Sequence, residues 1–362
     1  MNTTLIIDGN WLLMSRLFVV KQYFDISNNV SEKENGTHQL QDLMCRSINI
    51  VINKFDGIVD NIILVSDLGS WRKKLKKPGF FHEDYKGTRI KDSEIDWPHV
   101  YKALDSIVDN CKKLGITACK EVDVEGDDWV YYWSRYLNSN SINCIIWSSD
   151  RDLQQLVQVD NFAFTAWFNE SQKGGLPGLF LHKSLKPAEL DDIDQFMQID
   201  NSNILLDSIQ TRVSAITYID PADIIEEKII CGDISDNIKS ICTKEKNGRM
   251  KKITEKMWNS CKDATHTTSL KEFFENKNSI CTILNEKFDL PISNVLELFD
   301  YNTKLVYLND TIYPQEILDI MNNIEYKKFD LSYIKNNYKI LASSENETKP
   351  IEDIFDSLSG LF

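Results

Sequence analysis

Aspartate and glutamate residues stand at the ends of apolar segments, where carboxylates could gather around metal ions. Asp8 follows residues 5–7, Asp67 follows residues 62–65, and Asp150 follows residues 142–147. Carboxylate oxygens without paired histidine or cysteine ligands favour Mg²⁺ or Mn²⁺ over Zn²⁺. Such ions can activate water for attack on a phosphodiester. The candidate metal ligands are Asp8, Asp67, Glu125, Asp127, Asp128, Asp150, Asp152, Asp233 and Asp236.

The apolar segments that precede these acids have the length and composition of buried parallel strands. Residues 4–7, 62–65 and 142–147 are aliphatic or β-branched, and helical patterns separate them. Residues 162–168 and 178–181 are expected to extend the sheet as an antiparallel hairpin. The predicted fold is therefore α/β, with a mostly parallel central sheet flanked by helices and a helical C-terminal region. Open sheets of this class bind ligands at the carboxyl ends of their strands.

Each acid also has a simpler interpretation, because aspartate often caps a helix or occupies a turn. Asp127, Asp128 and Asp152 all begin helical patterns, where a carboxylate is favourable by itself. A whole set of carboxylates at one edge is harder to explain in this way. At about 4 Å and an effective dielectric near 20, each like-charged pair costs on the order of 4 kcal/mol. Such a cluster must take up protons or bind cations.

The order of the acidic motifs carries a family resemblance over about residues 1–340. The motifs are Ile-Asp-Gly-Asn at 7–10, Ser-Asp at 66–67 followed by Trp71-Arg72, Glu-Gly-Asp-Asp at 125–128, Ser-Asp-Arg-Asp at 149–152, and Gly-Asp-Ile-Ser-Asp-Asn-Ile at 232–238. This set resembles the flap endonuclease or 5′-nuclease family, and within it the ribonuclease H group of T-even-type phages. One departure is Gly126, where many relatives have alanine. We expect it to be tolerated, because the acids on either side keep their spacing.

The resemblance implies two-metal hydrolysis, with two Mg²⁺ ions for which Mn²⁺ can substitute. It implies catalytic roles for Asp8, Asp67, Asp127 and Asp150, together with Lys86 and Arg89. The first metal region would comprise Asp8, Asp67, Glu125, Asp127 and Asp128. The second would comprise Asp150, Asp152, Asp233 and Asp236.

Residues 71–95 mix cations with aromatic side chains that could stack on bases. A run of charge is often only a solvated surface. In the resembling family, however, a basic arch crosses the active site at this position. The expected nucleic-acid contacts are Arg72, Lys73, Tyr85, Lys86 and Arg89.

A second basic stretch lies at residues 239–252, with Asn247-Gly248 as a turn. Relatives carry a helix-hairpin-helix with a Gly-Ile-Gly-type turn here, and this chain lacks that turn. The stretch is therefore either a duplex-binding loop or a lysine-rich solvent loop. The candidate contacts are Lys244, Lys246, Arg249, Lys251 and Lys252.

Composition limits the remaining possibilities. The chain has 362 residues, of which 42% are hydrophobic, and a formal net charge of −14. That charge disfavours nucleic acid as a partner unless many of the acids face bound cations. The 8 cysteines form no Cys-x-x-Cys pair, and several that lie in apolar runs are expected to be buried thiols. No signal peptide or membrane span is recognised, so we expect a cytoplasmic monomer in a bacterium or a phage-infected cell.

The expected organisation is an α/β catalytic domain at 1–203, a helical domain at 204–341, a flexible linker at 342–350 and a short peptide at 351–362. The peptide resembles sliding-clamp-binding motifs of phage replication proteins. A terminal helix that packs on its own core would show the same apolar spacing. The candidate clamp-binding residues are Ile354, Phe355, Leu358, Leu361 and Phe362.

The expected function is that of a Mg²⁺-dependent 5′ to 3′ exonuclease and flap endonuclease on RNA:DNA hybrids and duplex or flapped DNA. Its implied role is primer removal in lagging-strand replication, with a single-strand-binding protein as a further possible partner. Two alternatives stay open at this point, a PIN-like ribonuclease and a catalytically weak, clamp-recruited scaffold that binds 5′ ends. A haloacid dehalogenase phosphatase is excluded, because it needs aspartate where the chain has Asn10.

Overall fold

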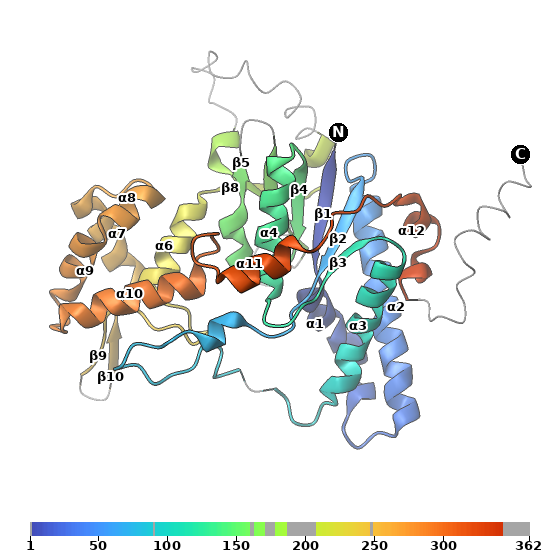
Figure 1. Ribbon diagram of the computed structural model, residues 1–362, viewed down its shortest axis with the longest axis horizontal. Coiled ribbons are helices and arrows are strands. Elements are labelled where there is room, and N and C mark those ends of the chain that lie inside the picture. Colours follow the sequence, from blue (N-terminus) through green and yellow to red (C-terminus); the bar gives the residue numbers. More distant parts are fainter. Residues whose placement is uncertain are drawn as a thin grey trace, which may run out of the picture.

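An eight-stranded, mostly parallel sheet forms the centre of the protein (Figure 1). The computed structural model describes residues 2–89, 91–159, 163–170, 178–186, 208–246 and 249–342. The strands of the sheet are β1 (Thr3–Asp8), β2 (Asn61–Val65), β3 (Thr117–Cys119), β4 (Asn143–Trp147), β5 (Gln158–Val159), β6 (Phe164–Asn169), β7 (Gly178–His182) and β8 (Ile216–Ile219). Their order is β3-β2-β1-β4-β6-β7-β8, and β5 pairs with β6.

The strand directions confirm the predicted α/β class. Strand β1 lies between β2 and β4 and is parallel to both, and all of its residues are buried. The predicted antiparallel extension is also confirmed, since Phe168 of β6 pairs with Leu179 of β7. The expected turn at residues 172–175 lies outside the described residues. Strands β1, β2 and β4 run in one direction. Asp8, Asp67 and Asp150, which lie at or just after the ends of these strands, are therefore at the same carboxyl edge of the sheet.

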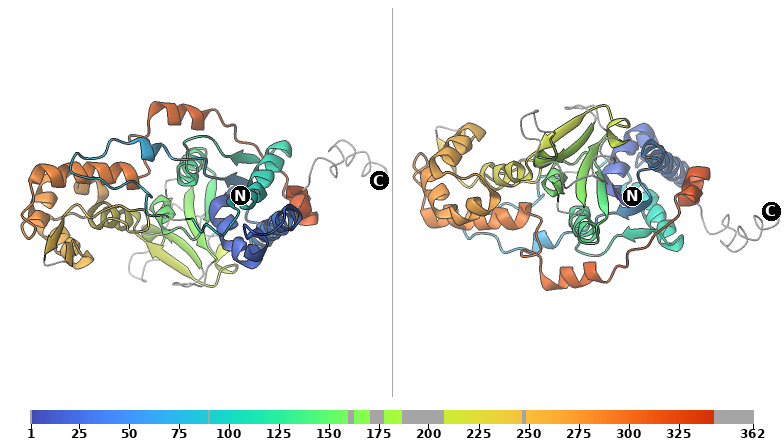
Figure 2. Two further views of the ribbon diagram at one scale, coloured as in Figure 1. Left: turned by 90° about the horizontal axis from the view of Figure 1, so that it is seen from below. Right: turned by 90° about the horizontal axis from the view of Figure 1, so that it is seen from above.

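Helices cover both faces of this sheet (Figure 2). One face packs against α1 (Gly9–Val20), α2 (Val30–Lys54) and α3 (Trp97–Lys113). The other packs against α4 (Gly126–Ser139) and α11 (Gln315–Asn322). The 3₁₀ helices are η1 (Lys21–Phe24), η2 (Trp71–Lys74), η3 (Arg151–Leu156), η4 (Lys183–Leu185) and η6 (Tyr338–Leu341). Among the described residues, no helix has both the length and the apolar character needed to cross a membrane.

A separate helical unit lies beside the sheet (Figure 1). It contains α6 (Pro221–Cys231), α7 (Glu255–Thr265), α8 (Leu270–Glu275), α9 (Lys277–Asn285), α10 (Ile292–Val306) and the hairpin of β9 (Thr243–Lys246) and β10 (Arg249–Lys252). Its helices enclose their own apolar core, which includes Ile229, Phe273, Phe288 and Phe299. The unit is therefore held together independently of the sheet.

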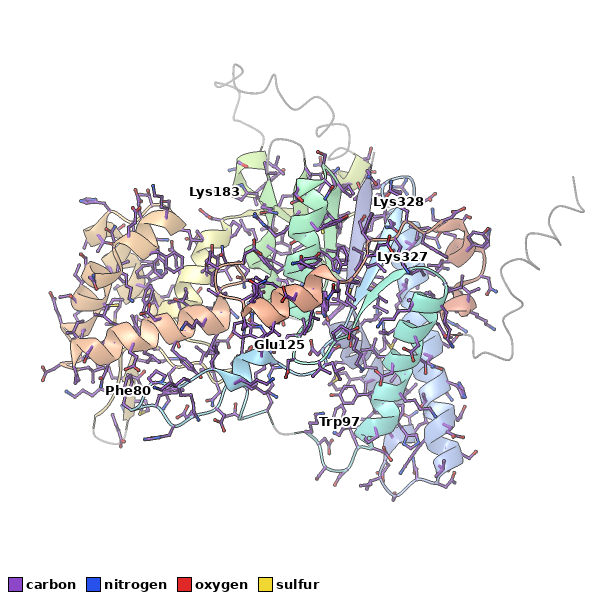
Figure 3. The ribbon with its side chains drawn as sticks, in the orientation of Figure 1. Phe80, Trp97, Glu125, Lys183, Lys327 and Lys328 are labelled. Atoms are coloured by element: carbon purple, nitrogen blue, oxygen red, sulfur yellow. The ribbon has the colours of Figure 1, made fainter. Side chains whose placement is uncertain are left out.

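The chain enters the helical unit from β8 and returns to the sheet after α10. The sequence prediction placed all of residues 204–341 in a helical domain, whereas β8 pairs with β7 and α11 packs on the sheet. Further along, the Tyr326 hydroxyl lies 3.0 Å from Thr4 Oγ1, and Asn61 Nδ2 donates to the Lys327 carbonyl at 2.8 Å (Figure 3). Helix α12 (Ser332–Asn336) then packs on the same face as α2. The helical unit is thus an insertion, and the predicted clamp peptide lies outside the described residues.

The cysteines match the sequence prediction. All of them are free, and all except Cys231 are buried. Thiols in such apolar surroundings act as small core side chains.

Candidate active site

Asp8 and Asp150 are joined by one buried serine at the carboxyl edge of the sheet. The Ser148 hydroxyl donates to Asp8 Oδ2 at 2.7 Å and accepts from the Asp150 backbone N–H at 2.9 Å. Asp8 Oδ1 accepts from the Trp11 N–H at 3.0 Å and so caps α1. Burial, with smaller contributions from Asp67 and Asp150, raises the pKa of Asp8 to about 7. Two of the predicted catalytic acids are therefore held next to each other.

Replacing Ser148 with alanine is expected to lower the free energy of unfolding by about 1–3 kcal/mol, because the hydroxyl has no exposed surface and serves two partners. Urea denaturation monitored by circular dichroism would measure this change. Ser106→Ala is the matched control, since the half-buried Ser106 donates to the Lys102 carbonyl of its own helix in an exposed hydrogen bond. Equal midpoints for the two variants would contradict the bridging role of Ser148.

Asp67 lies against the first turn of α4, which carries further predicted acids. Its Oδ1 accepts from the Gly126 N–H at 2.5 Å, and its Oδ2 accepts from Asn10 Nδ2 at 2.8 Å. Asp127 follows on α4, is half-buried, and has no hydrogen-bond partner among the described residues. Burial, then the charges of Asp150, Asp8 and Glu125, raise the pKa of Asp127 well above its usual range. The carboxylates of Asp8, Asp67, Asp127 and Asp150 are thus close enough to repel one another.

Arg72 and Asp128 form a buried ion pair at the base of the predicted arch. Arg72 is 2% exposed, and its Nη1 lies 2.7 Å from Asp128 Oδ1 and 2.9 Å from Glu125 Oε2. Asp128 also accepts from Trp71 Nε1 at 3.2 Å and from the Tyr313 hydroxyl at 3.0 Å. Burial opposes the charge on Arg72, but Asp128, Tyr313 and Glu125 hold its pKa well above the usual range.

This burial bears on two sequence predictions, and both stay predictions. Arg72 was expected to contact nucleic acid and Asp128 to bind metal, yet both side chains are enclosed and neutralise each other. Their physical role is to fix η2, the start of the arch, against the first turn of α4. Glu125 lies at this junction (Figure 3) and is buried with them.

The middle of the arch packs against the helical unit. Phe81 and Tyr85 belong to the apolar core of that unit, and the Phe81 ring centroid lies 5.8 Å from that of Tyr301. The Lys86 N–H donates to the Asp236 carbonyl at 2.8 Å. Tyr85 is 7% exposed, and its hydroxyl lies 3.3 Å from Asp236 Oδ2. A stacking contact between Tyr85 and a base would therefore require the arch to leave this position.

Lys86 and Arg89 connect the arch to the predicted acids. Lys86 Nζ lies 2.5 Å from Glu125 Oε1 and 3.8 Å from Asp236 Oδ2. Arg89 forms an ion pair with Asp236. Burial opposes the charge on Lys86, but Glu125, Tyr85, Asp127 and Asp236 together outweigh it and raise the pKa of Lys86. Both cations lie next to the acids, as the arch hypothesis requires.

The acids predicted for the second metal region have three different sets of neighbours. Lys228 of α6 bridges Asp152 and Asp233, at 2.6 Å from Asp233 Oδ2. Asp236 instead faces the arch, and Asp150 interacts with Asp8 and Asp127. Burial, together with Asp150, raises the pKa of Asp152 to about 6 although Lys228 opposes this shift. Asp150 therefore lies between the two regions to which the acids were assigned.

The carboxylates fit a hard divalent cation in their chemistry. Within the described part of the chain, no three aspartate, glutamate, histidine or cysteine side chains are gathered closely enough to form a ready-made metal site. All the candidate ligand atoms are oxygens, Asp127 accepts no hydrogen bond from the residues that the structure describes, and the acids repel one another. Mg²⁺ prefers such ligands and keeps several of its water molecules, so it needs few direct protein contacts.

The second basic stretch forms an exposed hairpin instead of the predicted loop. Lys244 on β9 and Arg249, Lys251 and Lys252 on β10 are exposed, as is Lys73 on the arch. Lys251 Nζ donates to the Lys287 carbonyl at 2.7 Å. The turn at residues 247–248 and the side chain of Lys246 lie outside the described residues. The other cations are placed where a large polyanion could reach them.

Sequence reasoning missed four residues that position the acids. Asn10 stands inside the Ile-Asp-Gly-Asn motif and could have been noticed there. Ser148 precedes the Ser-Asp-Arg-Asp motif, and Lys228 lies in the segment 204–341 that was predicted to be helical. Tyr313 carries no local signal, because only the return of the chain to the sheet brings it to Asp128.

Residues 3–175 match the family model of the 5′-3′ exonuclease N-terminal resolvase-like domain. The matched segment contains Asp8, Asp67, residues 125–128, Asp150 and Asp152, but not Asp233 or Asp236. No curated protein sequence matches the chain.

Similar solved structures come from bacteriophage T5. One is the T5 flap endonuclease in a pseudo-enzyme–product complex with DNA and metal ions, with 16% identity, a TM-score of 0.48, and coverage of 94% of this chain and 100% of that chain. Another is the T5 5′-exonuclease with bound zinc, with 15% identity, a TM-score of 0.43 and the same coverage.

Proposed function

We propose that the protein is a Mg²⁺-dependent 5′ to 3′ exonuclease and flap endonuclease. The observation that carries this proposal is the convergence of Asp8, Asp67, Asp127 and Asp150 at one sheet edge, beneath an arch that presents Lys86 and Arg89. The match of residues 3–175 to a 5′-3′ exonuclease domain supports it.

The acids and the arch would have separate roles. Asp8, Asp67, Asp127 and Asp150 would hold the ions, and when bound these supply Lewis acidity that favours attack of water on a phosphodiester. Ser148 holds Asp8 and Asp150 in a fixed relation. Lys86 and Arg89 would bind the phosphate groups, with the exposed cations of the β9–β10 hairpin along the duplex.

The finer biological role rests on the resemblance to the T-even ribonuclease H group. We propose RNA:DNA hybrids and duplex or flapped DNA as substrates, and removal of RNA primers as the task. Recruitment of a monomeric enzyme by a sliding clamp through residues 351–362 belongs to the same proposal, as does cooperation with a single-strand-binding protein.

The test uses a nicked duplex labelled at either end, with an RNA-primed strand and a 5′-flapped variant, in Mg²⁺ and then in EDTA. Short products released from the 5′ end only with Mg²⁺ are expected. Folded protein that binds these substrates without metal-dependent cleavage would refute the nuclease and favour a 5′-end-binding scaffold.

Replacing Lys86 with methionine is expected to reduce the cleavage rate about 100-fold, because a preorganised cation near developing charge is worth about that much. Methionine keeps the apolar stem while removing the charge. The single-turnover rate on the flapped substrate is the measurement. Lys76→Met is the control, since Lys76 is exposed on the same segment. Equal rates for the two variants would remove Lys86 from the proposed site.

A further inference from the structure

Asn10 and Gly126 both donate hydrogen bonds to the Asp67 carboxylate. Asn10 Nδ2 donates to Asp67 Oδ2 at 2.8 Å, and the Gly126 N–H donates to Oδ1 at 2.5 Å. Each oxygen of the carboxylate therefore has one donor, from two different helices. A carboxylate can accept about four hydrogen bonds, so each oxygen keeps capacity for another ligand.

The orientation of the Asn10 side chain is itself determined by its neighbours. Its Oδ1 accepts from the Ser66 hydroxyl at 2.8 Å and from the Asp67 N–H at 3.1 Å. Rotating the amide would place its NH₂ group against two donors and its oxygen against a carboxylate. Asn10 can therefore donate to Asp67 in only one orientation.

The glycine at position 126 leaves room for the close approach of the Asp67 carboxylate. A Cβ atom built at this position would lie 2.9 Å from Asp67 Oδ1. Real Cβ atoms do not approach an oxygen so closely, so alanine would displace the carboxylate and weaken its bond to the backbone. The departure to glycine at this position, which was expected to be tolerated, therefore fits the geometry of this chain.

We infer that Asn10 is a positioning residue that orients Asp67 for divalent-metal binding, and that Gly126 makes room for that orientation. The inference rests on the proposed function, because it takes Asp67 as a metal ligand. Hydrogen-bonded partners of ligating carboxylates typically contribute 10- to 100-fold to metal affinity or activity. Asn10 has this relation to Asp67 but would not touch the metal or the substrate.

The experiment compares wild type, Asn10→Ala and Gly126→Ala by calorimetric titration of the full chain with Mn²⁺ alone. About 10-fold or greater weakening of Mn²⁺ binding is expected for Asn10→Ala, and weakening is also expected for Gly126→Ala. Asn53→Ala, which removes an exposed asparagine from α2, should bind Mn²⁺ like wild type. The melting temperature of each variant in EDTA shows whether it is folded.

Two further measurements separate positioning from a structural role. In the Asp67→Asn background, Asn10→Ala should cause no additional loss of Mn²⁺ affinity, because both changes act on one carboxylate. In the cleavage assay, Asn10→Ala should raise the Mg²⁺ concentration for half-maximal rate and leave the KM for nucleic acid unchanged. The inference would be overturned if folded Asn10→Ala protein bound Mn²⁺ with wild-type affinity. It would also be overturned if Asn10→Ala lowered Mn²⁺ affinity as much in the Asp67→Asn background as in the wild-type background.

The cleavage assay on wild-type protein tests the proposed function, and the Mn²⁺ titration of the variants tests the positioning role. Wild-type protein that binds Mn²⁺ but does not cleave would refute the nuclease and leave the positioning role standing. Metal-dependent cleavage by wild-type protein, together with unchanged Mn²⁺ affinity in Asn10→Ala, would support the nuclease and refute the positioning role of Asn10.

Discussion

Asp127→Asn protein is expected to lose cleavage by on the order of 1,000-fold while it still binds nucleic acid. Among the described residues Asp127 has no hydrogen-bond partner, and the charge of Lys86 offsets only part of the repulsion from Asp150, Asp8 and Glu125. A carboxylate kept half-buried among Asp8, Glu125 and Asp150 is useful only if a cation binds to it. Asparagine has the same shape and cannot supply that charge.

The same substitution should stabilise the folded protein in EDTA. Removing one of several repelling charges is expected to add about 0.5–2 kcal/mol to the free energy of unfolding, as is common where a site trades stability for activity. Single-turnover cleavage, a binding assay in Ca²⁺ and urea denaturation in EDTA measure the three effects.

Asp123→Asn is the matched control for this variant. Asp123 lies in the loop before α4 and pairs with Lys74, and its backbone φ of 66° suits asparagine. Its cleavage rate should equal that of wild type. Full activity in Asp127→Asn would exclude Asp127 from the site, and loss of binding with loss of stability would indicate a disturbed α4.

Asp128→Asn is expected to lower the free energy of unfolding by about 3–5 kcal/mol, with or without metal. Asp128 has no exposed surface, and its carboxylate faces the buried Arg72 guanidinium at 2.7 Å. Asparagine would leave Arg72 with Glu125 as its single carboxylate partner within the described residues. A small protein has about 5–15 kcal/mol of stability in total, so the loss would be readily measured by urea denaturation.

Tyr313→Phe provides the comparison, because it removes only the neutral hydroxyl that donates to Asp128. Its expected cost is about 0.5–1.5 kcal/mol. If Asp128→Asn were as stable as Tyr313→Phe while Mn²⁺ affinity fell, Asp128 would bind metal, as the sequence suggested, instead of anchoring the arch.

The parts of the fold that followed from the sequence were those specified by local pattern. Strands β1, β2 and β4 are continuous apolar runs, so both their existence and their parallel direction could be predicted. Strand β8 has only the residues Ile216–Ile219, and four residues carry too little periodicity to be recognised. Its parallel pairing with β7 also depends on a distant segment.

The positions of the acids depend on local pattern more than the surroundings of the nearby cations do. Aspartates that follow strands converge because of the sheet topology, which the pattern indicates. Arg72 precedes a run of lysines, a pattern that indicates a solvent-exposed segment. It is nevertheless buried, because it pairs with Asp128, which in turn bonds to Tyr313, and both residues are far away in sequence. Tyr85 was similarly expected to face nucleic acid, but its environment is supplied by the helical unit.

The insertion of the helical unit affects when the contacts around the sheet-edge acids can form during synthesis of the chain. Thr4 in the first strand forms its side-chain hydrogen bond with Tyr326, which is 322 residues away. Asp128 accepts a hydrogen bond from Tyr313, which is 185 residues away. Contacts of such long range form slowly because a long loop must close first. On the ribosome, the sheet-edge acids therefore emerge well before the segment that holds Arg72 and Asp128 in place. We expect a nascent chain to lack the arrangement of acids described above until residues 313–326 have been synthesised.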